Sequence, residues 1–414
     1  MNISPKTTPP RLALTFVFVF VTVTLDAIGI GLIFPVMPDL IREVTGSTLS
    51  DAALWGGVLS TSFAVMQFLF GPVIGARSDH FGRKPVLTLS LAMMSLDYLV
   101  LALAPTIWLL LAARNVSGIT AATYSTATAV IADLTPPEER GRCFGLIGAG
   151  FGVGFVLGPL IGGLLAGIDT RAPFWAAAAL AAANMAFGLL TFRESLAPTN
   201  RNPFRLWSSN PLGALIAALR QPGLRPALLT FLLLSIAMNV YPVIWPYFGP
   251  ARFDWSTQVV GLSLTLYGLC FATGQILLVG PTLRRFGERR AVLFGLVVNL
   301  VTLTAMGLVT SGPLALALIP LTALSGVCTP ALQAILSRQT CADAQGALQG
   351  ILASLTAIAM IVAPPLISGT FADFTAPGAM IHAPGAPFLL SAALMVAAIL
   401  FHVAGARAPA QTPP

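Results

Sequence analysis

Twelve long apolar runs constrain this chain more than any other feature of its sequence. A helix rises about 1.5 Å per residue, so roughly 20 apolar residues cross the ~30 Å hydrocarbon core of a bilayer. Only 9% of the residues are charged, against about 25% in a typical soluble domain, and 56% are hydrophobic. The sequence therefore predicts an all-α integral membrane protein with twelve transmembrane helices. The runs lie near residues 12–35, 55–74, 85–104, 107–131, 143–167, 173–192, 226–248, 258–279, 290–310, 313–337, 346–371 and 385–404.

Lysine and arginine are distributed unevenly between the loops on the two sides of the predicted membrane. If the N-terminus lies inside, nearly all of them fall in inner loops, whereas the outer loops hold only Arg42, Arg171 and Arg252. Such an excess marks the cytoplasmic side. We therefore expect both termini in the cytoplasm and a multi-pass protein of the bacterial cytoplasmic (inner) membrane. Because this topology explains the net charge of +7, the charge gives no reason to expect a nucleic-acid partner.

The sequence also contains an internal repeat, in which glycines and prolines of the first half recur 205 residues later in the second half. Parallel half-repeats of this kind build transporters that hold their substrate between the two halves. The polar stretch 193–225 divides the runs six and six. We predict an N-terminal six-helix bundle at 1–192, a cytoplasmic linker at 193–225 with a short helix around Leu212–Leu219, and a C-terminal six-helix bundle at 226–414. The pairs related by the offset include Gly75 and Gly280, Gly82 and Gly287, Gly141 and Gly346, Gly145 and Gly350, and Pro159 and Pro364.

A charged hairpin joins the second and third runs. It reads Gly75-Ala-Arg-Ser-Asp79-His-Phe-Gly82-Arg83-Lys84. An ordinary charged turn would account for these residues one by one, but the whole pattern resembles the loop signature of the major facilitator superfamily. The resemblance implies the major facilitator fold. In that family the acid equivalent to Asp133 pairs with the loop arginine in the outward-facing state. This suggests a cytoplasmic conformational gate made of Gly75, Asp79, Gly82, Arg83, Lys84 and Asp133.

Three ionisable residues, Asp26, Asp97 and Arg114, lie deep within the runs. A charge at the bilayer centre costs a few kcal/mol, so such a residue is expected to be functional or paired. Counting residues from the ends of the runs puts Asp97 and Arg114 at the same depth, where they can form a structural ion pair. Asp26 then has no fixed cation, which suits it to bind and release protons. All three are candidates for proton coupling.

The fifth run contains an unusual series of glycines. Small residues four apart let two transmembrane helices approach closely, and a proline bends a helix. A nucleotide-binding glycine loop is excluded because no strand precedes the series. The pattern resembles the motif that marks exporters within the major facilitator superfamily. The resemblance favours export over uptake. The residues that carry it are Gly154, Gly158, Pro159, Gly162 and Gly163.

Other segments resemble the tetracycline/proton antiporters in particular. The segments Leu25–Pro38, Ser95–Tyr98 and Arg114–Thr120 look like theirs. Those exporters carry a histidine in the eighth helix and an aspartate in the ninth, where this chain has Phe271 and Asn299. The resemblance therefore implies proton coupling that rests on the N-terminal half.

Sparse polar and aromatic residues within the runs are candidates to line a central cavity. Each of them taken alone can equally pack against a neighbour or face lipid. As a set they suit a small amphiphilic compound better than a sugar or a phosphate ester, which need more hydrogen-bonding groups. They are Phe34, Gln67, Thr120, Tyr124, Asn239, Tyr241, Trp245, Phe271, Gln275, Asn299 and Gln333.

These observations predict a proton-coupled secondary transporter that exports a small amphiphilic compound, such as a tetracycline-like or other drug. Two alternatives stay open: a facilitator for another metabolite, such as a sugar or a siderophore, and a membrane receptor or scaffold without transport. We expect no enzyme, because the runs hold no Ser/His, paired-Asp or H-E-x-x-H arrangement. We also expect a monomer with no metal and no cofactor, driven by the proton gradient.

Overall fold

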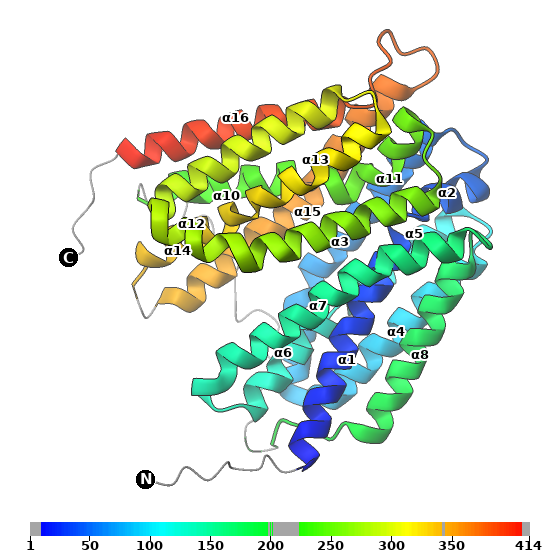
Figure 1. Cartoon of the computed structure of the whole chain (residues 1–414). Helices are drawn as coiled ribbons and strands as arrows, with labels where there is room; N and C mark the ends of the chain where they lie inside the picture. The colour runs from blue at the N-terminus through cyan, green and yellow to red at the C-terminus, as the bar shows by residue number, and fades with distance from the viewer. Residues whose placement is uncertain (1–9, 198, 200, 202–222, 342–343, 408–414) are drawn as a thin grey trace.

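The computed structural model describes residues 10–197, 199, 201, 223–341 and 344–407, and this part of the chain is helical throughout, with short connections (Figure 1). The predicted linker helix around Leu212–Leu219 lies outside the described residues, so the linker limits stay a prediction. The helices are α1 (Pro10–Ile33), α2 (Met37–Thr45), α3 (Leu49–Phe81), α4 (Arg83–Leu103), α5 (Ile107–Thr120), α6 (Thr123–Leu134), α7 (Pro137–Ala166), α8 (Ala172–Thr191), α10 (Arg225–Met238), α11 (Val240–Phe253), α12 (Thr257–Leu308), α13 (Gly312–Leu324), η2 (Ser325–Val327), α14 (Cys328–Arg338), α15 (Gln345–Thr375) and α16 (Ala386–Arg407).

The predicted count of twelve membrane spans is confirmed. Ten helical stretches are long and apolar enough to cross a membrane. One of them, the 52-residue α12, contains two predicted spans, because its backbone leaves helical geometry at Gly287. Helices α5 and α6 are each too short alone, but they follow one another across Ala121 and Ala122 and make the fourth span together.

Helix α2 was not predicted. It starts after Pro35 with Pro38 in its first turn and ends at Gly46, whose φ of 63° gives a left-handed cap. Proline at a helix start and glycine just past its end are local signals for a helix of this kind. Its nine residues are too few to cross a membrane, so a search for long apolar runs misses it.

The 205-residue offset relates backbone conformations as well as residues. Gly82 has φ 108° and ψ 163°, and its equivalent Gly287 has φ 74° and ψ 164°. Only glycine enters this region readily, and each glycine here lets two spans meet in a hairpin without a loop. The break at Ala121 likewise maps onto η2, since 121 + 205 = 326. The predicted internal repeat is therefore present in the structure.

The two halves meet through α3 with α15 and through α7 with α12. We call the end that carries Gly82 and Gly287 the hairpin end, and the opposite one the α2 end. At the α2 end the helices touch, because a Cβ on Gly57 would collide with Ser368, and Gly163 lies against Gly261. At the hairpin end the glycines of these helices, for example Gly75 and Gly350, have no neighbouring atom within 4 Å of the place that a Cβ would occupy. The halves therefore touch at the α2 end and separate towards the hairpin end, as Figure 1 also shows.

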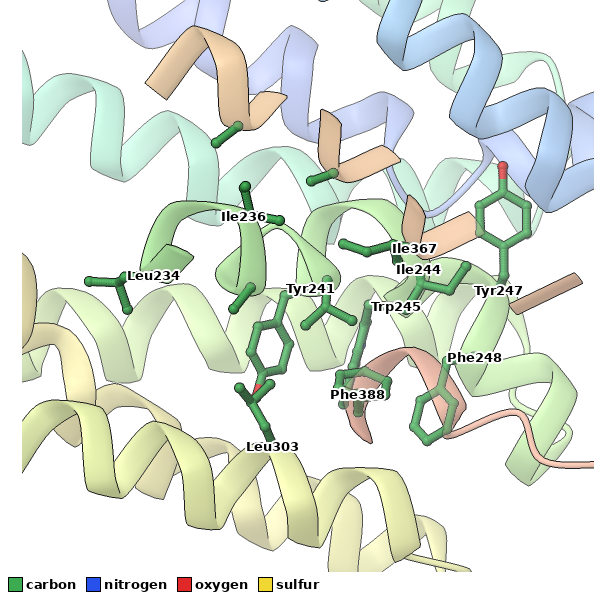
Figure 2. Packing of buried hydrophobic residues seen from close by; sticks show 14 of the residues in the cluster. Leu234, Ile236, Tyr241, Ile244, Trp245, Tyr247, Phe248, Leu303, Ile367 and Phe388 are labelled. Atoms are coloured by element: carbon green, nitrogen blue, oxygen red, sulfur yellow. The ribbon is translucent and has the colours of Figure 1, made fainter. Parts of the chain in front are cut away.

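Buried aromatic side chains of the C-terminal half pack together in the core, among them Tyr241, Trp245, Phe248 and Phe388 (Figure 2). The ring of Trp245 lies 5.9 Å from that of Phe248 and 6.2 Å from that of Phe388. The indole N–H of Trp245 donates to Ser263 Oγ at 2.8 Å, so this buried ring leaves no donor unpaired. This packing fixes the helices that line the cavity described next.

Candidate functional site

An apolar cavity of about 380 Å³ lies between the two halves. It borders the contact of Gly163 with Gly261, because residues of α7 and α12 on the hairpin side of that contact form two of its walls. The surface of its walls is almost entirely apolar. The lining residues are Phe34, Phe151, Gly152, Phe155, Val156, Pro159, Met238, Tyr241, Pro242, Trp245, Pro246, Leu264, Tyr267, Gly268, Phe271, Ala272 and Ile319.

Aromatic rings face the cavity from both halves. On one side Tyr267 stacks on Tyr241 at 5.6 Å and on Phe271 at 6.0 Å, with interplanar angles of 22° and 20°. On the other side Phe151 and Phe155 stack at 6.2 Å. Flat apolar walls of this kind favour a planar, lipophilic part of a ligand.

The structure separates the predicted cavity residues into two groups. Phe34, Trp245 and Phe271 line the cavity, and so does Tyr241. Tyr124 does not line it but packs on Phe151 with ring centroids 5.6 Å apart. The walls also include Phe151, Phe155 and Tyr267, which the sequence analysis missed. The sequence signal that could have identified Phe151 and Phe155 is their spacing of four residues, which places both rings on one face of a helix.

The predicted polar residues do not line the cavity. The side chains of Asn239 and Thr120 instead form hydrogen bonds with the backbone of their own helix. The amide of Asn239 donates to Ser235 O at 2.7 Å, and the hydroxyl of Thr120 donates to Val116 O at 3.1 Å. Gln275 donates to Gly326 O at 3.1 Å, across to the break in the tenth span. A buried amide is costly without a partner, and a nearby carbonyl is the closest acceptor in a span. Gln67, Asn299 and Gln333 also lie away from the cavity lining.

Asp26 lies buried in α1, with 8% of its surface exposed. It is not among the residues that line the cavity. A Cβ on Gly29, one turn further along α1, would collide with the hydroxyl of Tyr98. Tyr98 also lies within electrostatic range of Asp26, Asp97 and Arg114. Tyr98, which the sequence analysis did not single out as a site residue, therefore lies near Asp26 as well as near the other two charges.

The predicted ion pair between Asp97 and Arg114 is confirmed. Nη2 of Arg114 donates to Oδ2 of Asp97, and the side chains of Arg114 and Asp97 are 15% and 3% exposed. The guanidinium also lies over the ring of Phe63, 5.9 Å from its centroid. Oδ1 of Asp97 and Nε of Arg114 are buried with no protein partner among the described residues. The pair neutralises its own charge within the N-terminal half.

The hairpin cluster consists of Asp79, Arg83 and Asp133. Arg83 donates from Nε to Asp133 at 3.0 Å and from Nη1 to Asp79 at 2.5 Å, and it also bonds Ser78 Oγ at 3.1 Å. The suggested Asp133–Arg83 pair is therefore present. It was expected as part of a gate closed at this end, yet it forms within one half while the hairpin ends of the halves stand apart. The pair alone does not join the two halves.

Glu194 is a further member of this cluster that the sequence analysis missed. Its carboxylate accepts from the backbone N–H groups of Arg83 at 2.8 Å and Lys84 at 3.1 Å. These N–H groups open α4 and have no partner within the helix, so Glu194 caps it. A Cβ on Gly82 would occupy the place of this carboxylate. No local pattern in the sequence connects residue 194 with residue 83.

The C-terminal half carries the same cluster with opposite charges. Adding 205 converts Asp79, Arg83 and Asp133 into Arg284, Glu288 and Arg338. Glu288 and Arg338 form an ion pair at 3.0 Å, although the Arg338 side chain is 78% exposed. In both halves an ion pair therefore ties the start of the span after the hairpin to the end of the next span.

The glycine series of α7 packs against α1, as its spacing suggests. A Cβ on Gly154 would meet Ala27, one on Gly158 would meet Gly31, and one on Gly162 would meet Leu32. Pro159 lies inside α7 and lines the cavity. Gly163 faces the other half at Gly261, and the carbonyl of Pro159 lies against the same glycine. Close packing of α1 and α7 brings the helix of Asp26 next to the helix that forms one cavity wall.

Comparison with known proteins gives relatives over most of the chain. The tetracycline resistance protein, class C, of Escherichia coli is 41% identical over 347 residues, which cover 84% of this chain and 87% of that protein. The class G protein of Vibrio anguillarum is 39% identical over 346 residues, with coverage of 82% and 86%. Multidrug resistance protein 2 of Bacillus subtilis is 28% identical over 347 residues, with coverage of 82% and 84%.

Solved structures with the same fold include the human organic anion transporter MFSD10, with a TM-score of 0.69 and 25% identity, over 95% of this chain and 100% of that one. The nucleoside transporter NupG has a TM-score of 0.76 at 13% identity, over 96% and 100%, and shows the fold alone. The sequence profile of the Major Facilitator Superfamily matches residues 19–252 and again residues 227–414. The chain is a multi-pass membrane protein and belongs to the Major Facilitator Superfamily.

Proposed function

We propose that this protein exports a small amphiphilic organic compound in exchange for protons, by alternating access of a site between its two halves. The relatives are named for resistance to tetracycline and to multiple drugs, which supports a drug as the exported compound. The protein acts as a transporter and not as an enzyme, and as a monomer in the bacterial cytoplasmic membrane. The excess of arginine at the hairpin end supports placing that end and both termini in the cytoplasm.

The observation that carries this proposal is the aromatic cavity between the halves. It borders the contacts that close the α2 end, while the hairpin ends stand apart. In the proposed orientation this is an inward-facing arrangement, ready to accept a compound from the cytoplasm. Its apolar walls offer almost no hydrogen bonds, which disfavours the alternative of a sugar as substrate.

Asp26 serves as the proton carrier. It is buried beside Tyr98, and within the described residues no ion pair involves it. Asp97, in contrast, has Arg114 as its permanent counter-ion. Coupling requires that proton and substrate each have different affinities for the two arrangements, so protonation of Asp26 from outside favours the return to the inward-facing one.

The cavity walls also indicate the kind of compound. The tetracycline exporters carry a histidine and an acid where this chain has Phe271 and Asn299. Phe271 adds a flat apolar surface to the cavity, and Asn299 is buried away from it. A lipophilic planar compound, neutral or cationic, therefore fits better than a charged chelating one.

Accumulation of ethidium and of tetracycline in a sensitive bacterial host tests this proposal. We expect the protein to lower ethidium accumulation and to give weak or no tetracycline resistance. Phe271→Ala should reduce ethidium export, whereas Asn299→Ala should leave it unchanged. Strong tetracycline export that both variants retain in full would show that the cavity is not the substrate site.

A further inference from the structure

Asp39 and Thr257 join the two halves at the α2 end. Asp39 lies in the first turn of α2, and Thr257 is the first residue of α12. The Thr257 hydroxyl donates to Oδ2 of Asp39 at 2.5 Å, and both residues are half-buried. A hydrogen bond from a hydroxyl to a carboxylate is charge-assisted, and such bonds are roughly twice as strong as those between neutral groups.

The first turn of α12 lacks a negative charge of its own. Ser256 caps it by accepting from the N–H of Val259 at 3.5 Å, and its first turn contains no acid. A helix N-terminus carries a partial positive charge that a nearby carboxylate stabilises. Asp39 supplies that carboxylate from the other half of the protein.

This contact is not a product of the internal repeat. The equivalent positions are Ala52 and Ile244, from 257 − 205 and 39 + 205, and both are fully buried apolar residues. At that site α3 has its own acid, because the hydroxyl of Thr48 donates to Asp51 at 2.8 Å within the same half. The charged contact between the halves is therefore built at one of two symmetry-related places.

A second contact between the halves, formed by two uncharged side chains, can be compared with the bond between Asp39 and Thr257. Ser50 and Thr375 share a hydrogen bond at 2.9 Å where α3 meets α15. Both contacts must break when the α2 end opens, because each joins residues of opposite halves. The charged one is expected to contribute more to holding that end closed.

We infer that Asp39 is a latch of the α2 end, which acts by accepting a hydrogen bond from Thr257, at the start of α12 in the other half. The latch stabilises the arrangement seen here and must be released each time the transporter opens at the α2 end. It positions the two halves and takes no part in binding the substrate or the proton. The inference goes beyond the proposed function and does not depend on the identity of the substrate.

Distances between two spin labels across the α2 end test the latch. Ile168, between α7 and α8, and Met380, between α15 and α16, are almost fully exposed and belong to opposite halves. Both are replaced by cysteine in a background without the four native cysteines, and the protein is reconstituted in lipid without substrate. Asp39→Ala and Thr257→Val should each increase the population with the longer distance by about three- to tenfold.

Three controls separate a latch from a general loss of packing. Asp51→Ala removes an acid at the same end that bonds only within its own half, and Thr257→Ser keeps the hydroxyl, so both should match the parent. The double variant Asp39→Ala with Thr257→Val should open no further than the stronger single variant, since both remove one contact. Distance distributions that neither single variant changes, or effects that simply multiply in the double variant, would overturn the inference.

Discussion

The two halves of this transporter share one backbone plan but bury different side chains. Gly82 and Gly287 make the same hairpin at repeat-related positions. The N-terminal half, however, buries Asp26, Asp97 and Arg83, whereas the C-terminal half supplies Tyr241, Trp245, Tyr267 and Phe271 to the cavity. The comparison teaches that an internal repeat can keep its geometry while one copy buries more charged groups and the other supplies more of the cavity wall.

The hairpin clusters make the same comparison at closer range. The N-terminal cluster places one buried arginine between two acids, and the C-terminal cluster places one acid at the equivalent position, paired with an exposed arginine. The sign of the charge is reversed, but the tie between the spans is kept. Each pair therefore links two spans of its own half and does not itself join the two halves.

The largest effect is expected at the ion pair inside the N-terminal half. Asp97→Asn or Arg114→Gln alone leaves one buried charge without its partner and should lower the free energy of unfolding by about 3–5 kcal/mol. The double variant should recover part of this loss. Chemical denaturation in detergent measures all three, and a double-mutant cycle that is fully additive would mean that the two charges do not interact.

Removing the central charge of each hairpin cluster should have unequal effects. Arg83→Ala removes three side-chain bonds of a buried guanidinium and should cost about 2 kcal/mol of stability. Glu288→Ala breaks one pair with an exposed arginine and should cost about 0–1 kcal/mol. Thermal unfolding of the two variants compares them, and equal losses would argue against a difference between the clusters.

Substrate binding should depend on the aromatic wall of the C-terminal half. Tyr267→Ala removes a ring that stacks on two neighbours and should weaken binding of a lipophilic substrate about tenfold. Gln333→Ala, at an exposed position away from the cavity, serves as the matched control. Fluorescence titration with ethidium distinguishes them, and an undiminished affinity in Tyr267→Ala would place the binding site elsewhere.

The smallest difference is expected between the two hairpin glycines. Alanine at either position adopts an unfavourable positive φ, which costs about 1 kcal/mol or more. At Gly82 the added methyl group also displaces the carboxylate of Glu194, whereas at Gly287 it meets open space. Gly82→Ala should therefore be the less stable variant by a further ~1 kcal/mol. Unfolding midpoints of both variants show the order, which should disappear when Glu194 is replaced by alanine.

The membrane spans and the internal repeat of this protein can be predicted from its sequence, because the spans are long and the repeat offset is constant. The sequence also predicts the pair of Asp97 and Arg114, since two buried charges at one depth have few other partners. It does not predict that Asn239 and Thr120 bond their own helix backbone, because the direction of a side chain is set by packing. The contact of Glu194 with the start of α4 joins residues more than a hundred positions apart, and no local pattern marks it.

The central claim is that the N-terminal half carries the coupling proton on Asp26 while the cavity carries the substrate. Proteoliposomes loaded with a pH-sensitive dye test this claim directly, because the dye reports proton movement driven by an imposed ethidium gradient. We expect the wild-type protein to change the internal pH, and Asp26→Asn to abolish that change while it still exchanges ethidium for ethidium. Asn299→Ala should couple like the wild-type protein. Proton movement at the wild-type rate in Asp26→Asn would contradict the account.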